Sequence, residues 1–108
     1  MVNSVGFIEV YGFVTAVMAA DAAAKTADVR IVALDSTKPA GGDSAAIPLV
    51  MLVKLEGSVS AVKAAVDAGV NMANLYGGVI THHIISRPDE ETQKLIPLCS
   101  VGKDKLNK

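Results

Sequence analysis

The sequence predicts an α+β domain whose strands and helices follow one another in the order β-α-β-β-α-β. Short β-branched runs occur at four places, and alanine-rich segments with helical spacing separate the first two runs and the last two. No linker or internal repeat divides the 108 residues, so one domain with one core is expected. This order is that of the ferredoxin-like fold, a four-stranded antiparallel sheet with two helices on one face.

The first half of the chain supplies one helix between two strands. Residues 5–11 alternate weakly between apolar and polar side chains and are predicted as a strand that Gly12 ends. Helix formers dominate residues 13–27, which are predicted as the first helix. Residues 28–34 are short and β-branched, so they are predicted as the second strand. The buried face of the helix is expected to contain residues at helical spacing: Phe13, Val17, Ala20 and Ala24.

The second half continues with a strand, a helix and a last strand. Residues 47–57 are apolar on both faces up to Lys54, so this strand is expected in the centre of the sheet. Ser58 is a predicted N-cap for the second helix, and residues 79–86 are predicted as the fourth strand. The buried face of the second helix is expected to contain Val59, Val62, Val66, Gly69 and Ala73.

The residues after the fourth strand are predicted to form a short helix and a tail. Pro88 is expected to begin the helix, because proline suits the first helical position and acidic residues follow it. Residues 97–108 are expected to be a loosely held tail, which leaves the core of the domain at about residues 5–96.

Composition excludes several functional classes. Ten basic and eleven acidic residues give a net charge of −1, which predicts no broad attraction to nucleic acid or to anionic lipid. No apolar run approaches the roughly 20 residues of a membrane helix, and no signal peptide is visible at the N-terminus. The single cysteine, Cys99, excludes an intrachain disulfide and fits a reducing compartment.

No catalytic or metal-binding constellation is visible in the sequence. His82 and His83 are neighbours on a predicted strand, so they point to opposite faces and cannot chelate one metal together. Glu90 and Glu91 are interpreted as the solvated first turn of the short helix. Cys99 has no basic residue close to it in the sequence. The sequence therefore predicts no enzyme activity, no metal and no cofactor.

Three stretches in register carry a specific resemblance to a known family. They are GFIEVYGFVTAVMAADAAAKTADV at 6–29, GSVSAVKAAVDAG at 57–69 and VITHHIISRP at 79–88. In order and spacing they resemble the first helix region, the second helix and the strand ending in Arg-Pro of the hexameric shell proteins of bacterial microcompartments. The resemblance implies that residues 1–108 form a single BMC domain of the hexameric type.

The resemblance implies a structural role in a microcompartment shell in the bacterial cytoplasm. Family members form flat homohexameric tiles that join edge to edge, with other shell proteins, around encapsulated enzymes. Lys25 matches the lysine on the rim of the tile, and Arg87 matches the arginine that reaches across the same junction. Long cationic side chains can lie flat and donate to carbonyl groups of a neighbour. The family commonly has Asn where Asp28 stands and His where Asp89 stands.

The largest departure from the family is the connection between the second and third strands. Family members have a short Lys-Ile-Gly-Ser-Gly segment there, and six copies form a small pore for polar metabolites. Here residues 35–48 are several residues longer. Inward-facing Asp43 would hinder anions, and inward-facing Lys38 would favour them. The residues expected to line the pore are Lys38, Ala40, Gly41, Gly42, Asp43 and Ser44.

Two alternative functions remain open at this point. The same framework serves small-molecule-sensing regulatory oligomers, which would place a ligand site between subunits. A small metal or redox protein would use His82, His83 or Cys99. Some shell proteins of glycyl-radical compartments are thought to hold an iron–sulfur cluster at the pore, but such a cluster needs cysteine thiolates and residues 34–57 contain none.

Overall fold

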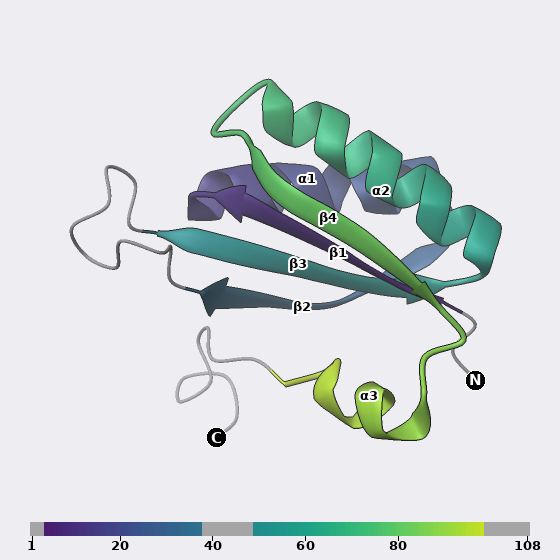
Figure 1. Ribbon diagram of the computed structural model, residues 1–108. Helices are drawn as coiled ribbons and strands as arrows, with labels where there is room; N and C mark the ends of the chain where they lie inside the picture. The colour runs from purple at the N-terminus through teal and green to yellow at the C-terminus, as the bar shows by residue number, and fades with distance from the viewer. Residues whose placement is uncertain (1–3, 38–48, 99–108) are drawn as a thin grey trace, which may run out of the picture.

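A computed structural model describes residues 4–37 and 49–98 of the chain and confirms the predicted fold class. The strand order in the sheet is β2-β3-β1-β4, and all neighbouring strands are antiparallel. Helices α1 and α2 cover one face, and α3 lies near the other (Figure 1). The elements are β1 (Ser4–Tyr11), α1 (Phe13–Thr26), β2 (Val29–Thr37), β3 (Val50–Gly57), α2 (Val59–Asn74), β4 (Val79–Ser86) and α3 (Glu90–Leu95).

Strand β3 lies between β1 and β2, as its apolar faces predicted. Met51, Val53 and Leu55 are buried and belong to the core that the two long helices cover. Between them, Lys54 points to the helix-free face, where it is also buried. A strand covered on both faces must be apolar along most of its length, which explains the sequence of β3.

The buried face of α1 differs from the prediction. Of the four expected residues only Ala20 is buried, whereas Phe13 and Val17 are 45% and 42% exposed. Alanine occupies so many positions that several faces of this helix are equally apolar, and periodicity does not distinguish them. The face with the smallest side chains packs inward because it lets α1 approach α2 closely. The buried residues are Thr15, Ala16, Ala19, Ala20 and Ala23.

Helix α2 begins where the sequence predicted, and most of its expected face is buried. The Ser58 hydroxyl accepts a hydrogen bond from the backbone N–H of Ala61 at 3.2 Å. Neighbouring elements approach Gly69 closely, because an added Cβ there would lie 2.6 Å from Ile8 Cδ1 and 3.2 Å from the carbonyl oxygen of Ala19. The buried residues are Val62, Ala65, Val66, Gly69 and Ala73; Val59, also expected on this face, is exposed.

The sheet has two ends, which we call the distal end and the loop end. At the distal end, one row crosses all four strands through Val29, Gly57, Ser4 and Ser86. At the loop end, β2 stops at Thr37 opposite the first residue of β3, and the connection between them, residues 38–48, lies outside the described residues. Figure 1 shows that α1 runs from the loop end to the distal end and that α2 runs back.

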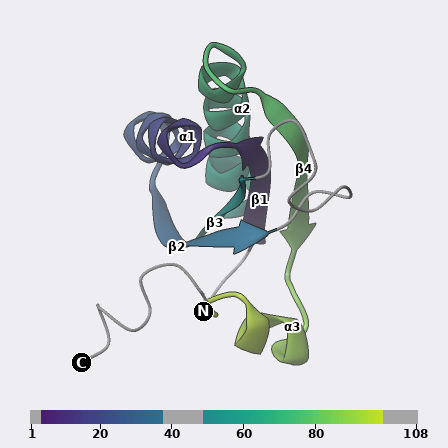
Figure 2. The same ribbon diagram turned by 90° about the vertical axis from the view of Figure 1, so that its left-hand side faces the viewer.

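The C-terminal segment crosses the helix-free face of the sheet (Figures 1 and 2). Asp89 is the N-cap of α3, and its carboxylate accepts from the N–H of Glu91 at 3.0 Å. Pro88 therefore precedes the helix and does not begin it, which corrects the prediction by two residues. Ile96 is buried directly after α3. Within the described ranges, no helix has the length and apolar character needed to cross a membrane.

Candidate functional site

Lys25 and Asp28 lie at the distal end, where α1 leads into the edge strand β2. The side chain of Lys25 is 74% exposed, and its Nζ lies 2.8 Å from Oδ2 of Asp21 one helical turn earlier. Asp28 is also exposed. Exposed ion pairs of this kind contribute little to stability. The ammonium group of Lys25 is therefore held only loosely within its own chain and is accessible to a partner.

Arg87 directly follows β4, which is the other edge strand of the sheet. Its φ of +48° is the only positive value of a non-glycine residue in the described part of the chain. This conformation costs an L-residue about 1–2 kcal/mol. A residue before proline also prefers extended backbone, so Pro88 adds a second constraint. Strained backbone of this kind occurs often at functional sites, and here it lies directly before the buried Pro88.

The three predicted rim residues occupy two corners of the distal end. Lys25 and Asp28 lie beside β2, whereas Arg87 lies beside β4. Because β3 and β1 separate these strands, the width of the sheet stands between the two corners. A contact between Lys25 and Arg87 therefore requires two copies of the chain.

Large apolar side chains are exposed around the loop end, and sequence reasoning missed them. Backbone hydrogen bonds tie these segments together: Gly12 N–H donates to the carbonyl of Leu49 at 3.0 Å, and Tyr11 N–H donates to that of Gly78 at 3.1 Å. Exposed apolar clusters on small proteins usually mark interaction surfaces. The residues of this loop-end apolar patch are Phe13, Val14, Leu49, Leu75, Tyr76 and Ile80.

The predicted pore residues lie outside the described residues, so their positions remain predictions. The described chain shows only that β2 ends and β3 begins at the loop end, beside the loop-end apolar patch. Cys99 also lies outside the described ranges. The residues in question are Lys38, Ala40, Gly41, Gly42, Asp43 and Ser44.

The two histidines are exposed on β4 and face opposite sides of the sheet, as predicted. His82 pairs with Ile8, whose side chain reaches α2, and His83 pairs with Phe7 on the helix-free side. Among residues 4–37 and 49–98, no three histidine, cysteine or carboxylate side chains lie close enough together to hold a metal ion.

Lys54 is a buried cation to which sequence analysis assigned no partner. Its side chain is 8% exposed, and its Nζ lies 3.5 Å from Oδ2 of Asp35 on β2. Nζ also donates a hydrogen bond to the carbonyl oxygen of Leu98 at 2.7 Å. A buried ammonium group must have such partners, since desolvation is costly. Lys54 thereby fastens the segment after α3 to the sheet.

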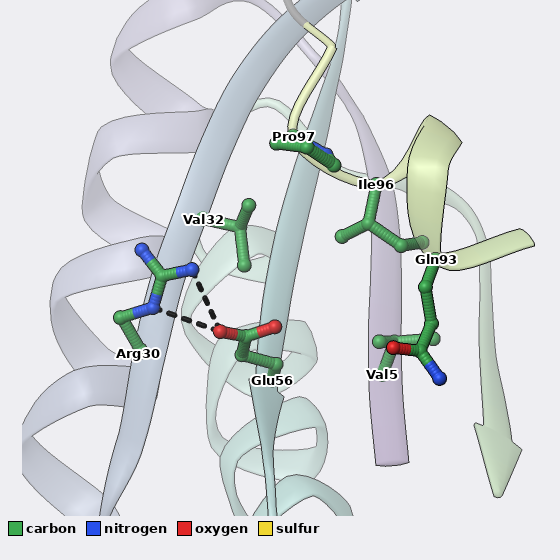
Figure 3. A pocket seen from close by; sticks show the side chains of 7 residues that line it. All are labelled: Val5, Arg30, Val32, Glu56, Gln93, Ile96 and Pro97. Carbon is green, nitrogen blue, oxygen red and sulfur yellow. Dashed lines mark hydrogen bonds and ion pairs between the residues drawn. The ribbon is translucent and has the colours of Figure 1, made fainter. Parts of the chain in front are cut away.

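A cavity of about 220 Å³ lies between this segment and the helix-free face of the sheet (Figure 3). At one side, Arg30 donates to Oε1 of Glu56 from Nε at 2.8 Å and lies 2.7 Å from it through Nη2. The remaining wall is largely apolar. The lining residues are Val5, Arg30, Val32, Glu56, Gln93, Ile96 and Pro97.

The fold defines a class of protein: a small α+β module with exposed apolar side chains at one end of its sheet and exposed charged side chains at the other. Comparison with protein families identifies which module this is. The model described as "BMC domain" matches residues 4–88. The chain therefore belongs to the BMC domain family, which confirms the resemblance found in the sequence.

Curated relatives of this chain are named as shell proteins. The bacterial microcompartment shell protein PduA of Citrobacter freundii is 36% identical over 95 residues, which are 88% of this chain and 92% of PduA. The carboxysome shell protein CcmK2 of Synechococcus elongatus is 38% identical over 97 residues, with 88% and 86% coverage. The shell protein EutK of Salmonella typhimurium is 40% identical over 96 residues, with 89% and 53% coverage. The chain spans about half the length of EutK and PduK.

A solved structure agrees with this family. The crystal structure of a microcompartments protein from Desulfitobacterium hafniense DCB superposes with a TM-score of 0.69 at 25% identity. The match covers 93% of this chain and 49% of that one.

Proposed function

We propose that this protein is a structural, non-enzymatic shell protein that forms cyclic hexameric tiles in a bacterial microcompartment. The proposal rests on family membership and on relatives named as shell proteins, such as PduA and CcmK2, of which the chain covers 92% and 86%. The observation that carries it is the separation of two surfaces: an apolar patch at the loop end and exposed cations at the distal end.

This separation suits a ring of chains. With the loop end directed toward the ring axis, neighbouring copies bury the loop-end apolar patch against one another, and the apolar area removed from water drives association. The connection between β2 and β3 then surrounds the axis. Six copies of Lys38, the Gly41–Gly42 pair, Asp43 and their neighbours line the pore, through which small polar metabolites pass.

The distal end then forms the rim of the tile. Lys25 and Asp28 of one tile face Arg87 of the next, so the two corners that a single chain holds apart meet across the junction. Strain at Arg87 sets the direction in which its side chain leaves the sheet. Tiles of this protein and of other shell proteins join by these contacts and enclose the enzymes of the compartment.

Replacing Lys25 tests the proposed rim. Lys25→Ala is expected to keep the ring but to abolish extended sheets, because the lost ammonium group serves contacts between tiles. Size-exclusion chromatography measures the ring, and electron microscopy measures the sheets. Lys63→Ala is the matched control, since Lys63 is another exposed helical lysine. Loss of the ring in Lys25→Ala would refute the rim assignment, and a wild-type chain that stays monomeric at high concentration would refute the shell function.

A further inference from the structure

We propose that the cavity beneath the C-terminal segment binds a small neutral molecule with a short alkyl body and a hydroxyl group that donates a hydrogen bond. The cavity lies on the helix-free face of the sheet (Figure 3). Val5 and Arg30 both pair with Glu56 next to the distal row of the sheet, which places this part of the cavity away from the loop-end apolar patch. The inference therefore does not depend on the proposed ring or on its pore.

The cavity has an apolar body built from both halves of the chain. Val5 of β1 and Ile96, which follows α3, are almost completely buried beside it. The register of β2 against β3 shifts between Ile31 and Ala33, and this irregularity sets the direction of Val32, which also lines the cavity. Pro97 closes the wall. These side chains suit an alkyl group.

Two of the polar atoms that face the cavity are hydrogen-bond acceptors, while Arg30 directs its Nε and Nη2 groups to Glu56. Oε1 of Glu56 takes both contacts from Arg30, and the second carboxylate oxygen points toward the middle of the lining residues (Figure 3). Nε2 of Gln93 donates to the carbonyl of Pro88 at 2.9 Å, which leaves the Gln93 carbonyl oxygen on the cavity side. Neither of these two oxygens accepts a hydrogen bond from the described residues. A ligand that fits them must donate.

Charge favours a neutral donor over an ammonium ion. The two charged residues of the lining, Arg30 and Glu56, neutralise each other. An ammonium ion would meet a carboxylate whose charge Arg30 already neutralises, and an anion would face two acceptors, so either ion would recover only part of its lost hydration energy. The volume of about 220 Å³ is below the range of roughly 300–1,000 Å³ typical of pockets for larger ligands, so a molecule of a few heavy atoms fits.

The wall formed by the C-terminal segment is held in place by a specific contact. Lys54 Nζ donates to the carbonyl of Leu98 at 2.7 Å, next to Pro97. The lysine is buried and also lies beside Asp35, so this contact is partly shielded from solvent. The cavity is therefore largely formed before a ligand arrives, which lowers the entropic cost of binding.

Two probes with the same carbon skeleton test the proposal. 2-Propanol donates a hydrogen bond, and acetone only accepts. In methyl NMR of the 108-residue chain, 2-propanol is expected to shift the resonances of Val5, Val32 and Ile96 saturably. Millimolar affinity is expected for so small a ligand. Acetone is expected to bind at least about threefold more weakly, because it lacks the donor. Propionate is expected to bind more weakly still.

Two variants connect the binding to the cavity. Gln93→Met keeps the approximate shape but removes the acceptor, together with the Nε2 hydrogen bond to the Pro88 carbonyl, and is expected to weaken 2-propanol binding about three- to tenfold. Lys94→Met, an exposed neighbour on α3, is the matched control and should bind like wild type. Val32→Phe fills the cavity and should abolish binding. If these variants do not fold, the probe comparison on wild type decides alone.

Each contrary result overturns the inference. Equal binding of acetone would show that no donor is required. Tightest binding of propionate would show that Arg30 makes an anion site. Shifts outside the cavity, or no saturation with any probe, would show that the cavity takes no ligand of this class. Failure of any of these tests leaves the ring and rim assays unaffected.

Discussion

Two residues of this chain, Lys54 and Arg87, have unusual environments. Lys54 interrupts an apolar central strand, and its ammonium group fastens the C-terminal segment through the carbonyl of Leu98. Arg87 holds a left-handed backbone at the corner of the sheet, directly before Pro88. Lys54 is expected to affect the free energy of unfolding. Arg87 is expected to affect both the free energy of unfolding and the proposed assembly of tiles.

Replacement of Lys54 measures the first contact. Lys54→Met keeps much of the volume but leaves the Leu98 carbonyl without its donor and Asp35 without this cation, so the free energy of unfolding should fall by about 1–3 kcal/mol. Chemical denaturation measures it. Lys63→Met makes the same change at an exposed site and should stay within about 0.5 kcal/mol of wild type. Equal effects would mean that the Lys54 contacts contribute nothing.

Replacement of Arg87 separates strain from assembly. Arg87→Gly and Arg87→Ala both remove the guanidinium group, so both are expected to impair sheet formation by electron microscopy. Only glycine tolerates the positive φ without cost, so Arg87→Gly should unfold with a free energy about 1 kcal/mol above that of Arg87→Ala. Normal sheets from either variant would exclude Arg87 from the rim.

Helix α2 shows how local signals and packing act on one element: its start is fixed by a capping residue, and its position by close contacts with other elements. Ser58 caps α2 with its own hydroxyl group, which is a local property of the sequence. Gly69 lies where α2 meets both β1 and α1, which is a property of three elements together. The two positions call for different tests.

The cap is tested by removing its hydroxyl. Ser58→Ala should lower the free energy of unfolding by about 1 kcal/mol, because the N–H of Ala61 loses its acceptor. Ser60→Ala, two residues later on the same helix, is exposed and is expected to change stability by no more than about 0.5 kcal/mol. Thermal and chemical denaturation compare the two. A larger effect at Ser60 would show that the cap is elsewhere.

The close approach at Gly69 is tested by a double-mutant cycle. Gly69→Ala should destabilise the fold by about 1–3 kcal/mol despite the better helix propensity of alanine, because its Cβ meets Ile8 Cδ1 and the backbone of Ala19. Ile8→Val removes Cδ1, so the double variant should be more stable than the sum of the single changes predicts. Strict additivity of the unfolding free energies would contradict the contact.

For the molecule as a whole, the main feature is a set of large apolar side chains that the isolated chain leaves exposed. The loop-end apolar patch has no cover within the described part of the chain. The proposed ring covers it with a second copy, while the strained corner and Lys25 stay on the outside. In this proposal the molecule is organised along the strand direction, with self-association at the loop end and contacts between tiles at the distal end.

A charge placed in the patch tests this organisation. Val14→Glu should prevent ring formation, because a carboxylate would be buried at the interface between copies. The monomer should stay folded, since Val14 is exposed and lies in the first turn of α1, where an acidic residue is favourable. Val59→Glu is the matched control, because Val59 is exposed in the first turn of α2 at the distal end. Sedimentation velocity measures both. Intact rings in Val14→Glu would place the patch outside the interface.

The order of the elements and their approximate bounds could be predicted from local patterns in the sequence. Strands and helices depend on periodicity, and α2 also has a cap and an inward-facing glycine, all of which are local signals. The sequence also determined the family through its two helix motifs and the Arg-Pro at the end of β4. These features need no knowledge of which elements touch.

The buried face of α1 depends on packing in the folded chain, since alanine makes several faces alike and the fit against α2 selects one. The tertiary structure also decided the partner of Lys54 and the cavity beside it, because both depend on residues far apart in sequence meeting across β1, β2, β3 and the C-terminal segment. Such contacts depend on the direction in which packed elements run, and no local pattern encodes that direction.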